Sequence, residues 1–360
     1  MKCGSVWLCL LLLTATIQTA AGQEEDDTED FDDFDDFDIS QFEDTGNSKA
    51  FCTNKVSGQS PTPLVSLAFD AQGPADLTTP AIGSFDEETA EWQLASGFRF
   101  NSNVPVVSKN SILINWGLNF THLQYRSGND VIYQNPLNVT LSDFRLNWLN
   151  TNLTVFKPLN DRHFLLAQAA FELNGDYSLR NGPALGNGRV PLALIFGFKP
   201  SDRLIWGVGV SRTYLGGALN VIPVIYYFHT FQNEKWGIEA LFPGRMQARY
   251  RSNSRNVWLL GYNVEGATYR LRNFSGIPDA ASVTNDAVEL RRSEIRAGLT
   301  YTRGLNDFIW VGLQAGYRIN YSFELDEGDF FRGFDSEDYL QENTLDDTWY
   351  FQLSISLVSP

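Results

Sequence analysis

The sequence predicts an all-β protein, an antiparallel transmembrane β-barrel of about fourteen strands (12–14) behind a disordered acidic N-terminal tail. From about residue 63 onward, apolar and polar residues alternate with period two, which is typical of a strand with one lipid-facing and one lumen-facing side. Clusters of Gly, Asn, Asp and Pro separate these runs. No stretch reaches the roughly 20 apolar residues of a transmembrane helix, so a membrane-spanning form of this chain has to be a barrel.

The N-terminus predicts a secretory signal peptide. Lys2 precedes an apolar run over 6–13, and the small residues Ala20, Ala21 and Gly22 follow it, which is the order of a cleaved export signal. A membrane anchor is the alternative, but its apolar core would have to be longer. The expected domains are a signal peptide over 1–22, a disordered acidic tail over 23–50 and an outer-membrane β-barrel over 51–360.

The segment from Glu24 to Asp44 carries thirteen acidic residues and no basic one. Such a block repels itself and cannot bury a core, so we expect a disordered tail on the periplasmic side. Its regularly spaced phenylalanines suit a short motif that docks on a partner, and a merely solvating tail is the alternative. Without these thirteen carboxylates the 43 acidic residues fall to 30, against 27 basic ones. The remainder is nearly neutral, and no nucleic-acid partner is expected.

Fourteen runs of alternation mark the expected strands. In the third run, Ile112, Trp116 and Phe120 share one face, and Asn115 and Asn119 the other. In the same way Trp92 falls with Leu94 and Phe98 in the second run, and Trp148 with Leu146 in the fourth, on apolar faces. The strands are expected near 64–70, 89–101, 111–126, 139–156, 163–173, 190–199, 203–213, 219–230, 235–242, 244–251, 257–272, 288–302, 308–323 and 347–358.

The connections between these runs alternate in length, which is an independent sign of an outer-membrane barrel with short periplasmic turns and long outer loops. Tight turn chemistry follows the even-numbered strands, as in Pro200-Ser-Asp202 and Gly304-Leu-Asn-Asp307. Most connections after odd-numbered strands exceed ten residues. The short connections near Leu215-Gly216-Gly217 and Pro243-Gly244 break this rule.

Tryptophans support a membrane location, because eight of them fall in the expected strands or at their ends, where they could form interfacial girdles. A soluble β-sandwich that buries these rings is the alternative, but it would need many more, shorter strands. The eight are Trp92, Trp116, Trp148, Trp206, Trp236, Trp258, Trp310 and Trp349.

The stretch from about Asn160 to Arg251 resembles a known family. It holds an Asn-Asp turn, the Gly-rich strand Trp206-Gly-Val-Gly-Val210, the run Ile222-Pro-Val-Ile-Tyr-Tyr227 and the run Lys235-Trp-Gly-Ile-Glu-Ala-Leu-Phe-Pro243. This succession resembles the Bacteroidetes-type outer-membrane β-barrel family that is filed as a domain of unknown function, over roughly 60–360. The resemblance implies a fold and an outer-membrane location but no activity. The ending Val358-Ser-Pro360 departs from the aromatic residue that closes many such barrels.

Charged residues on the expected inner face are the candidate functional residues. Arginine rings could make a pore that favours anionic solutes, with Arg245, Arg249 and Arg251 of one strand as the strongest candidates. Cross-pairing of both signs that merely fills the lumen is the alternative. The expected lumen lining is Arg99, Arg145, Arg245, Arg249, Arg251, Glu265, Glu294, Arg296 and Arg318, and Asp143 and Glu172 belong to the same face.

Cysteine and histidine content restricts other chemistry. Cys52 is the one cysteine outside the signal peptide, so no disulfide and no Cys/His metal site is expected. His122, His163 and His229 are the candidate bases for a lipid-modifying barrel enzyme, but none lies in a local motif with a serine nucleophile. We expect no cofactor and no enzyme activity.

These observations predict an exported outer-membrane barrel of the bacterial type that acts as a passive, porin-like channel for small solutes. A closed barrel that serves as a scaffold through its outer loops and acidic tail is the alternative. The expected partners are outer-membrane lipid, the barrel assembly machinery and a possible partner for residues 24–44.

Overall fold

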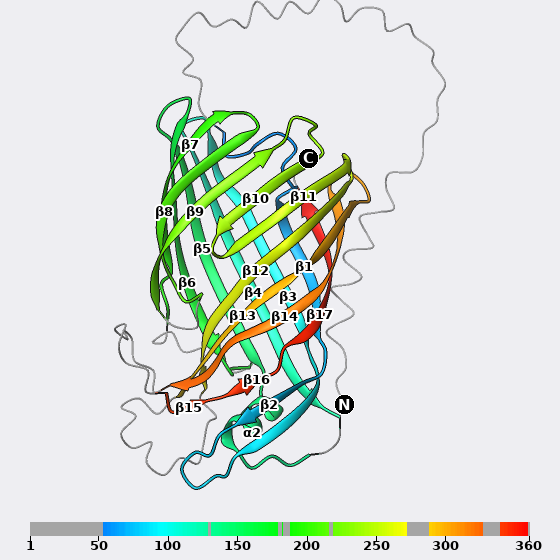
Figure 1. The fold of residues 1–360 in the computed structure, drawn as a ribbon. Helices are drawn as coiled ribbons and strands as arrows, with labels where there is room; N and C mark the ends of the chain where they lie inside the picture. Colours follow the sequence, from blue (N-terminus) through cyan, green and yellow to red (C-terminus); the bar gives the residue numbers. More distant parts are fainter. Residues whose placement is uncertain are drawn as a thin grey trace, which may run out of the picture. The chain divides into compact units, whose positions relative to one another are not determined.

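The computed structural model describes residues 53–128, 131–178, 182, 188–215, 219–271, 288–326 and 339–358. The expected signal peptide and acidic tail lie outside these residues. Fourteen of the strands form one closed antiparallel ring, because β17 pairs with β1, Val358 opposite Pro63 (Figure 1). The predicted fourteen-strand barrel is thereby confirmed.

The strands of the ring follow one another around it in chain order, each hydrogen-bonded to the next. Their bounds lie close to the predicted ones except in β5, which starts later than predicted, and in β3, which runs eight residues past the predicted end at 101. They are β1 (Pro63–Gln72), β3 (Glu88–Lys109), β4 (Ile112–Ser127), β5 (Leu146–Pro158), β6 (His163–Gly175), β7 (Leu192–Ser201), β8 (Leu204–Thr213), β9 (Asn220–Thr230), β10 (Trp236–Phe242), β11 (Arg245–Asn253), β12 (Asn256–Leu271), β13 (Val288–Gly304), β14 (Ile309–Asp326) and β17 (Thr348–Val358).

The two ends of the barrel differ as the connection lengths predict. Tight connections join β3 to β4, β5 to β6, β7 to β8, β9 to β10, β11 to β12 and β13 to β14 at the end where Pro63 and Val358 lie, which we name the turn end. The opposite, loop end carries the longer connections together with β2 (Ala75–Thr79), β15 (Gln341–Glu342) and β16 (Thr344–Leu345). Short connections at 214–219 and 243–244 also lie at the loop end.

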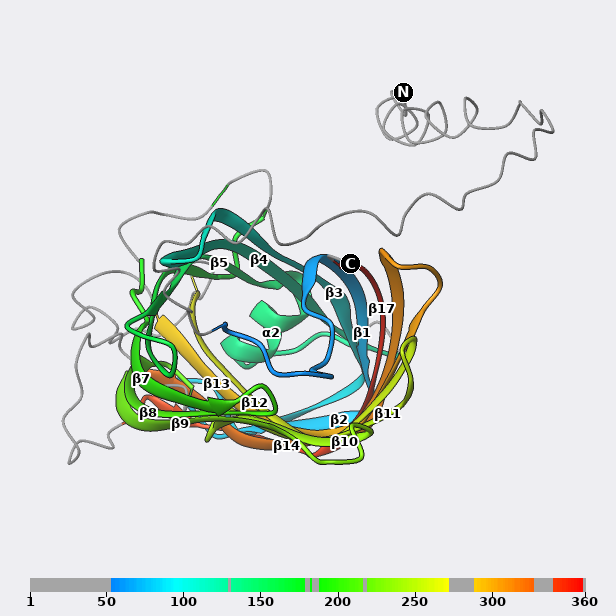
Figure 2. The ribbon, with the colours of Figure 1, turned by 90° about the horizontal axis from the view of Figure 1, so that it is seen from above.

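One predicted strand begins with a helix instead. The expected strand over 139–156 is α2 (Pro136–Asp143) followed by β5. Asn135 caps this helix by accepting a hydrogen bond from the Leu137 backbone N–H at 3.1 Å, and Pro136 occupies the first turn, where its missing N–H costs nothing. The prediction was wrong here because Asn135-Pro136 was read as part of a loop, and period two was read from residue 139, where the chain is still helical. Figure 2 shows α2 within the outline of the barrel.

The outer face of the ring is apolar, as a lipid-facing surface requires. Exposed large side chains recur at every second position of most strands, including Leu67, Phe69, Trp116, Leu194, Phe196, Trp206, Val208, Ile225, Leu260, Leu313, Leu353 and Ile355. The helix α2 is short, and in the parts of the chain that the structure describes no helix is long and apolar enough to cross a membrane.

The tryptophans divide between the two faces of the wall. Five of the eight are exposed: Trp116, Trp206, Trp236, Trp258 and Trp349. The other three belong to interior apolar clusters: Trp92 and Trp310 are buried in them, and Trp148 packs against one. The expectation that all eight tryptophans form interfacial girdles was therefore wrong.

A β-bulge explains the position of Trp92. The register of β3 against β4 shifts between Trp92 and Leu94, so Gln93 is an extra residue. One extra residue reverses the alternation. Leu94 and Trp92 therefore face opposite sides of the wall, although the sequence places them on one face.

The interior of the loop end is filled by an apolar core. It contains Trp92, Tyr125, Leu137 and Leu141 of α2, with Tyr269, Leu290 and Phe323 from the far wall. A much smaller cluster lies toward the turn end: Val56, Phe156, Phe164, Ile205 and Phe228.

The wall is lower along β7 to β11 than elsewhere. The β10–β11 turn ends level with Val264, whose backbone N–H donates to the Gly244 carbonyl at 2.7 Å. The strand β12 continues to Leu271, which is about 23 Å further along the strand. There β12 meets β6 directly, with Arg270 opposite Gly175. The barrel is therefore narrower between the low wall and the loop end. Side chains can fill this narrow part, while the wider part nearer the turn end keeps open space.

Candidate functional site

The candidate site is a chamber in the middle of the lumen with a volume of about 660 Å³. Strands from the whole ring contribute to it, among them β1, β3, β6, β11, β12 and β14. Its charged lining residues are Asp70, Arg99, Glu172, Arg245, Glu265 and Arg292. The apolar core closes it toward the loop end, and the segment 53–62 lies toward the turn end.

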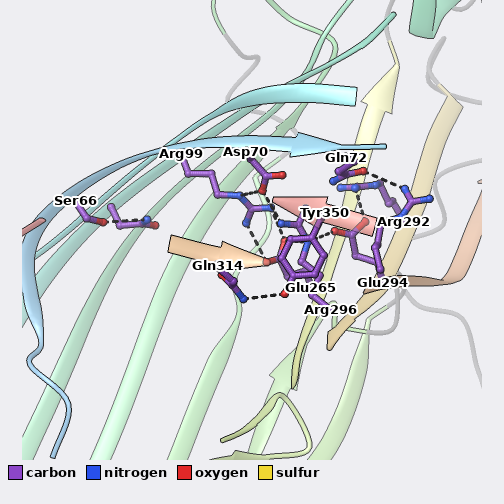
Figure 3. A network of polar contacts seen from close by, with 12 residues as sticks. Ser66, Asp70, Gln72, Arg99, Glu265, Arg292, Glu294, Arg296, Gln314 and Tyr350 are labelled. Atoms are coloured by element: carbon purple, nitrogen blue, oxygen red, sulfur yellow. Dashed lines mark hydrogen bonds and ion pairs between the residues drawn. The ribbon is translucent and has the colours of Figure 1, made fainter. Parts of the chain in front are cut away.

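A paired guanidinium of β3 spans the chamber. Arg99 donates from Nε to Asp70 Oδ2 at 2.7 Å, and from Nη1 and Nη2 to the two Glu265 oxygens at 3.0 and 2.9 Å. The forked geometry of arginine makes this bidentate contact strong and directional. Figure 3 shows Arg99 between Asp70 and Glu265, which come from β1 and β12. The pairing ties together strands that are far apart in the sequence.

A second guanidinium extends the same network. Arg296 of β13 donates to Asp70 Oδ2 at 2.5 Å and to Glu294 Oε1 at 2.6 Å, and its guanidinium lies 5.0 Å from the centre of the Tyr350 ring. Arg292 pairs with the other Glu294 oxygen. All four charged groups are nearly inaccessible to solvent. Buried charges persist only when paired in this way, so the network is a fixed part of the wall.

Arg318 is held mainly by neutral acceptors. Its Nη1 donates to Gln72 Oε1 at 3.1 Å, and its Nη2 to the Asp346 carbonyl. Tyr350 OH accepts from Gln314 Nε2 at 2.9 Å on the neighbouring strand. These contacts complete a polar layer across β1, β14 and β17.

The predicted lining residues divide into those that lie in this network and those that lie outside it. Arg99, Glu265, Glu294, Arg296 and Arg318 come together in this network. Arg99, Glu265, Glu294 and Arg296 are cross-paired there, whereas Arg318 has neutral acceptors. The sequence missed Asp70, Gln72, Arg292 and Tyr350, for which the only available signal was their place on the polar face of an alternating strand.

The remaining predicted residues lie apart. Arg249 is fully buried toward the turn end, where Nη1 donates to Glu239 Oε1 at 2.9 Å. Arg245 is exposed in the chamber, and among the described residues no side chain pairs with it or with Arg251. Arg145 is exposed in the short link between α2 and β5, outside the network, because the helix takes up the residues expected to be strand. Asp143 is the exposed end of that helix.

The wall opposite the network is polar but uncharged apart from Glu172. Asn150 Nδ2 donates to Glu172 Oε1 at 3.0 Å, while Asn150 Oδ1 accepts from Asn119 and Asn152. Next to these asparagines the lumen has a second cavity of about 290 Å³, lined mostly by apolar side chains of β6 to β10. The lumen therefore has a charged side and an apolar side.

The segment 53–62 lies across the turn end of the lumen. The Ser57 N–H donates to the Asp202 carbonyl at 2.7 Å, and the Ser57 carbonyl accepts from Thr230 Oγ1 at 2.6 Å. The Ser60 N–H donates to Glu239 Oε1 at 2.9 Å, and Val56 packs in the small apolar cluster. We name this segment the strap, and it obstructs the turn end from inside.

The three histidines lie on separate strands and have the following side-chain partners. His122 Nδ1 lies 2.7 Å from Asn147 Oδ1, His163 Nδ1 lies 3.1 Å from Asn160 Oδ1, and His229 Nδ1 lies 3.3 Å from Tyr227 OH. These partners are neutral, and each histidine lies on a different strand pair. In the part of the chain that the structure describes, no group of three or more His, Cys, Asp or Glu side chains could hold a metal ion.

The fold and its lumen define a closed β-barrel with an apolar outer face and an internal chamber, the class of transmembrane barrels. The chain belongs to the family described as a domain of unknown function, DUF6268, whose model matches residues 134–358. The matched region is shorter than the predicted 60–360. No curated protein matches the chain in sequence.

Several solved structures have a remote likeness to this chain. A FadL homologue of Pseudomonas aeruginosa is 8% identical with a TM-score of 0.36, over 86% of this chain and 99% of that one. The toluene transporter TodX of Pseudomonas putida is 9% identical with a TM-score of 0.29, over 86% and 95% of the two chains. The outer-membrane channel DcaP of Acinetobacter baumannii is 10% identical with a TM-score of 0.24, over 86% and 99% of the two chains.

Proposed function

We propose that this protein is a bacterial outer-membrane barrel that passes a small solute, with the strap as the closure of its periplasmic end. The observation that carries the proposal is the chamber of about 660 Å³ that lies between the apolar core of the loop end and the strap. In an outer membrane, short turns face the periplasm, which places the turn end and the strap there.

The path begins at the low wall. The second cavity reaches the β10–β11 turn at Phe242, Pro243 and Gly244 and shares Thr213 and Leu215 with the chamber. A solute entering there would bypass the apolar core of the loop end. It would then cross the chamber and leave past the strap.

The strap is suited to opening because its attachments are few. Apart from Val56, it is held by single hydrogen bonds to Thr230, Glu239 and Asp202. Lys199 Nζ adds two more, donating to the Lys55 carbonyl at 2.8 Å and to Thr53 Oγ1. A hydrogen bond contributes about 1 kcal/mol net. The wall strands have continuous ladders on both sides and would stay in place when the strap leaves.

A closed scaffold is the second candidate, and the loop-end core favours it. Nineteen buried residues fill the barrel there, and in this view the chamber is a by-product of the narrowing. The outer loops and the acidic tail would then bind partners. Export by the signal peptide, an origin in Bacteroidetes-type bacteria, insertion by the assembly machinery and the absence of enzyme activity are parts of the proposal under either candidate.

Single-channel conductance in planar bilayers separates the two. We would compare the mature protein, a variant lacking 53–62 and a variant lacking 23–47, after heat-modifiable gel mobility shows that each is folded. The channel proposal expects larger or more frequent openings without the strap than in the mature protein. Silence of the folded strap-deleted barrel would overturn the channel and leave the scaffold. A change with the tail deletion alone would place the closure in the acidic segment instead.

A further inference from the structure

We propose that the two lumen cavities form one binding site for an organic monoanion with an apolar body, such as a medium-chain carboxylate. The inference rests on the proposed function and names the solute class for it. The joined apolar and polar cavities, with Arg245 where they meet, are the structural basis.

The apolar part of the site is the cavity of about 290 Å³ beside the low wall. Its walls include the side chains of Leu166, Ile195, Val224, Tyr226 and Leu241. These side chains point into the lumen, on the opposite face from the lipid-facing residues of the same strands. An apolar wall inside a barrel removes area from water only when something apolar fills it, and a solute with a hydrocarbon body would do so.

The polar part of the site is the chamber, and the two are continuous. Thr213 and Leu215 line both cavities. A ligand with its body against Leu241 can therefore place a polar head in the chamber. The volumes, about 660 and 290 Å³, lie in or next to the range of about 300–1,000 Å³ for small-molecule sites.

Arg245 supplies the charge for the head group. It is the cross-strand partner of Leu241, so the two side chains are neighbours on the inner face of β10 and β11. Arg245 lines the chamber and is exposed there. Among the described residues it makes no ion pair and no side-chain hydrogen bond. A guanidinium without such a partner can bind a carboxylate through two parallel hydrogen bonds.

The other charges of the chamber do not compete for the ligand. Arg99 is occupied by Asp70 and Glu265, and Arg292 by Glu294. Glu172 is the one chamber carboxylate outside the ion-pair network that could repel an anion. It is 8% exposed and is held by Asn150 on β5, whereas Arg245 is on β11.

Calorimetric titration of the purified full barrel in non-ionic detergent, with empty micelles subtracted, tests the site. The probes are octanoate, 1-octanol with a similar body and no charge, and acetate with the charge and no body. Wild type is expected to bind octanoate more tightly than either of the others. Arg245→Gln should weaken octanoate at least tenfold and leave 1-octanol unchanged, because a charge-assisted hydrogen bond is worth about 1.5–3 kcal/mol.

Two further variants complete the test. Arg303→Gln removes an exposed arginine of β13 that lines neither cavity, and it should leave all three titrations unchanged. Ala193→Trp places a large ring in the apolar cavity and should weaken octanoate and 1-octanol together. Equal octanoate binding by wild type and Arg245→Gln would overturn the inference, as would acetate binding as tightly as octanoate.

The inference and the proposed function can fail separately. A barrel that conducts ions without its strap but binds no octanoate would overturn the anion site and leave the channel. Octanoate binding that depends on Arg245, in a barrel that never conducts, would overturn the channel and leave a binding site.

Discussion

The two ends of the lumen are closed in different ways. At the loop end, nineteen buried residues from the wall and α2 form a continuous apolar core. At the turn end, a strap of ten residues contributes one buried side chain, Val56, to a cluster of five. The first closure is built from the strands themselves, while the second is a segment laid over them.

This difference indicates which end can open. The loop-end core includes Trp92, Tyr269 and Phe323 on strands that also form the barrel ladder. Removing such residues exposes apolar area and leaves cavities. The strap can detach without breaking a wall hydrogen bond of the ring. Opening at the turn end is therefore expected to leave the folded barrel intact, and the following variants test that contrast.

The largest loss of stability is expected in the loop-end core. Trp92→Ala should lower the free energy of unfolding by about 4 kcal/mol, since Trp92 is 2% exposed and its removal leaves a large cavity. This free energy is measured by unfolding the barrel in lipid vesicles with urea and following the folded fraction by gel mobility. Trp349→Ala, on the outer face at 55% exposure, is the matched control and should cost less than half as much. Equal losses would mean that the core is not what holds this end.

The charged network should behave as part of the fixed wall. Arg296→Met removes a buried cation and leaves Asp70 and Glu294 each short of a partner, at an expected cost of about 3 kcal/mol. The same unfolding assay applies, with Arg303→Met as the control at an exposed arginine of the same strand. A loss below about 1 kcal/mol would show that the network is not needed to hold the wall.

The strap should respond in the opposite sense. Val56→Asp places a carboxylate in an apolar cluster and should release the strap, changing global unfolding by less than about 1 kcal/mol because local opening precedes it. Conductance should rise. Lys55→Ala is the control, since the Lys55 side chain is exposed and only its carbonyl binds Lys199. A barrel destabilised as much as by Trp92→Ala would remove the contrast between the two ends.

The smallest effect is expected at the surface of the turn end. Arg255 Nη2 and Asp307 Oδ1 lie 3.2 Å apart, but both side chains are largely exposed. Asp307→Asn should change the free energy of unfolding by less than about 0.5 kcal/mol, as is usual for exposed pairs. A larger change would mean that the turns contribute more to the stability of this end than their contacts indicate.

The strands were largely predictable from the sequence, for a physical reason. A wall one residue thick between lipid and lumen forces period-two alternation, and turn residues mark its ends. The helix α2, which occupies the start of the predicted strand 139–156, was missed because Asn135-Pro136 was read as part of a loop. Trp148 was assigned to the lipid side because an apolar inner core gives the same alternation as a lipid face. Trp92 was assigned there because the alternation was read through the β-bulge at Gln93.

The lumen was predictable only in outline. Alternation places Arg99 and Arg296 on the inner face, but it does not say how strands far apart in sequence align across the barrel. The pairing of Asp70 with both arginines depends on β1, β3 and β13 meeting there. The low wall was visible as two unexpectedly short connections, although its meaning required knowing that β6 and β12 meet above it.

The seam between β1 and β17 has a consequence for biogenesis. It joins Pro63 to Val358, so this pairing has one of the longest sequence separations in the molecule, and contacts of that kind form slowly. Until it forms, two strand edges stay unpaired and prone to bind other chains. Because the strap directly precedes β1, it can settle only once that edge is in place. The ring is therefore expected to close first, and the strap to close the lumen afterwards.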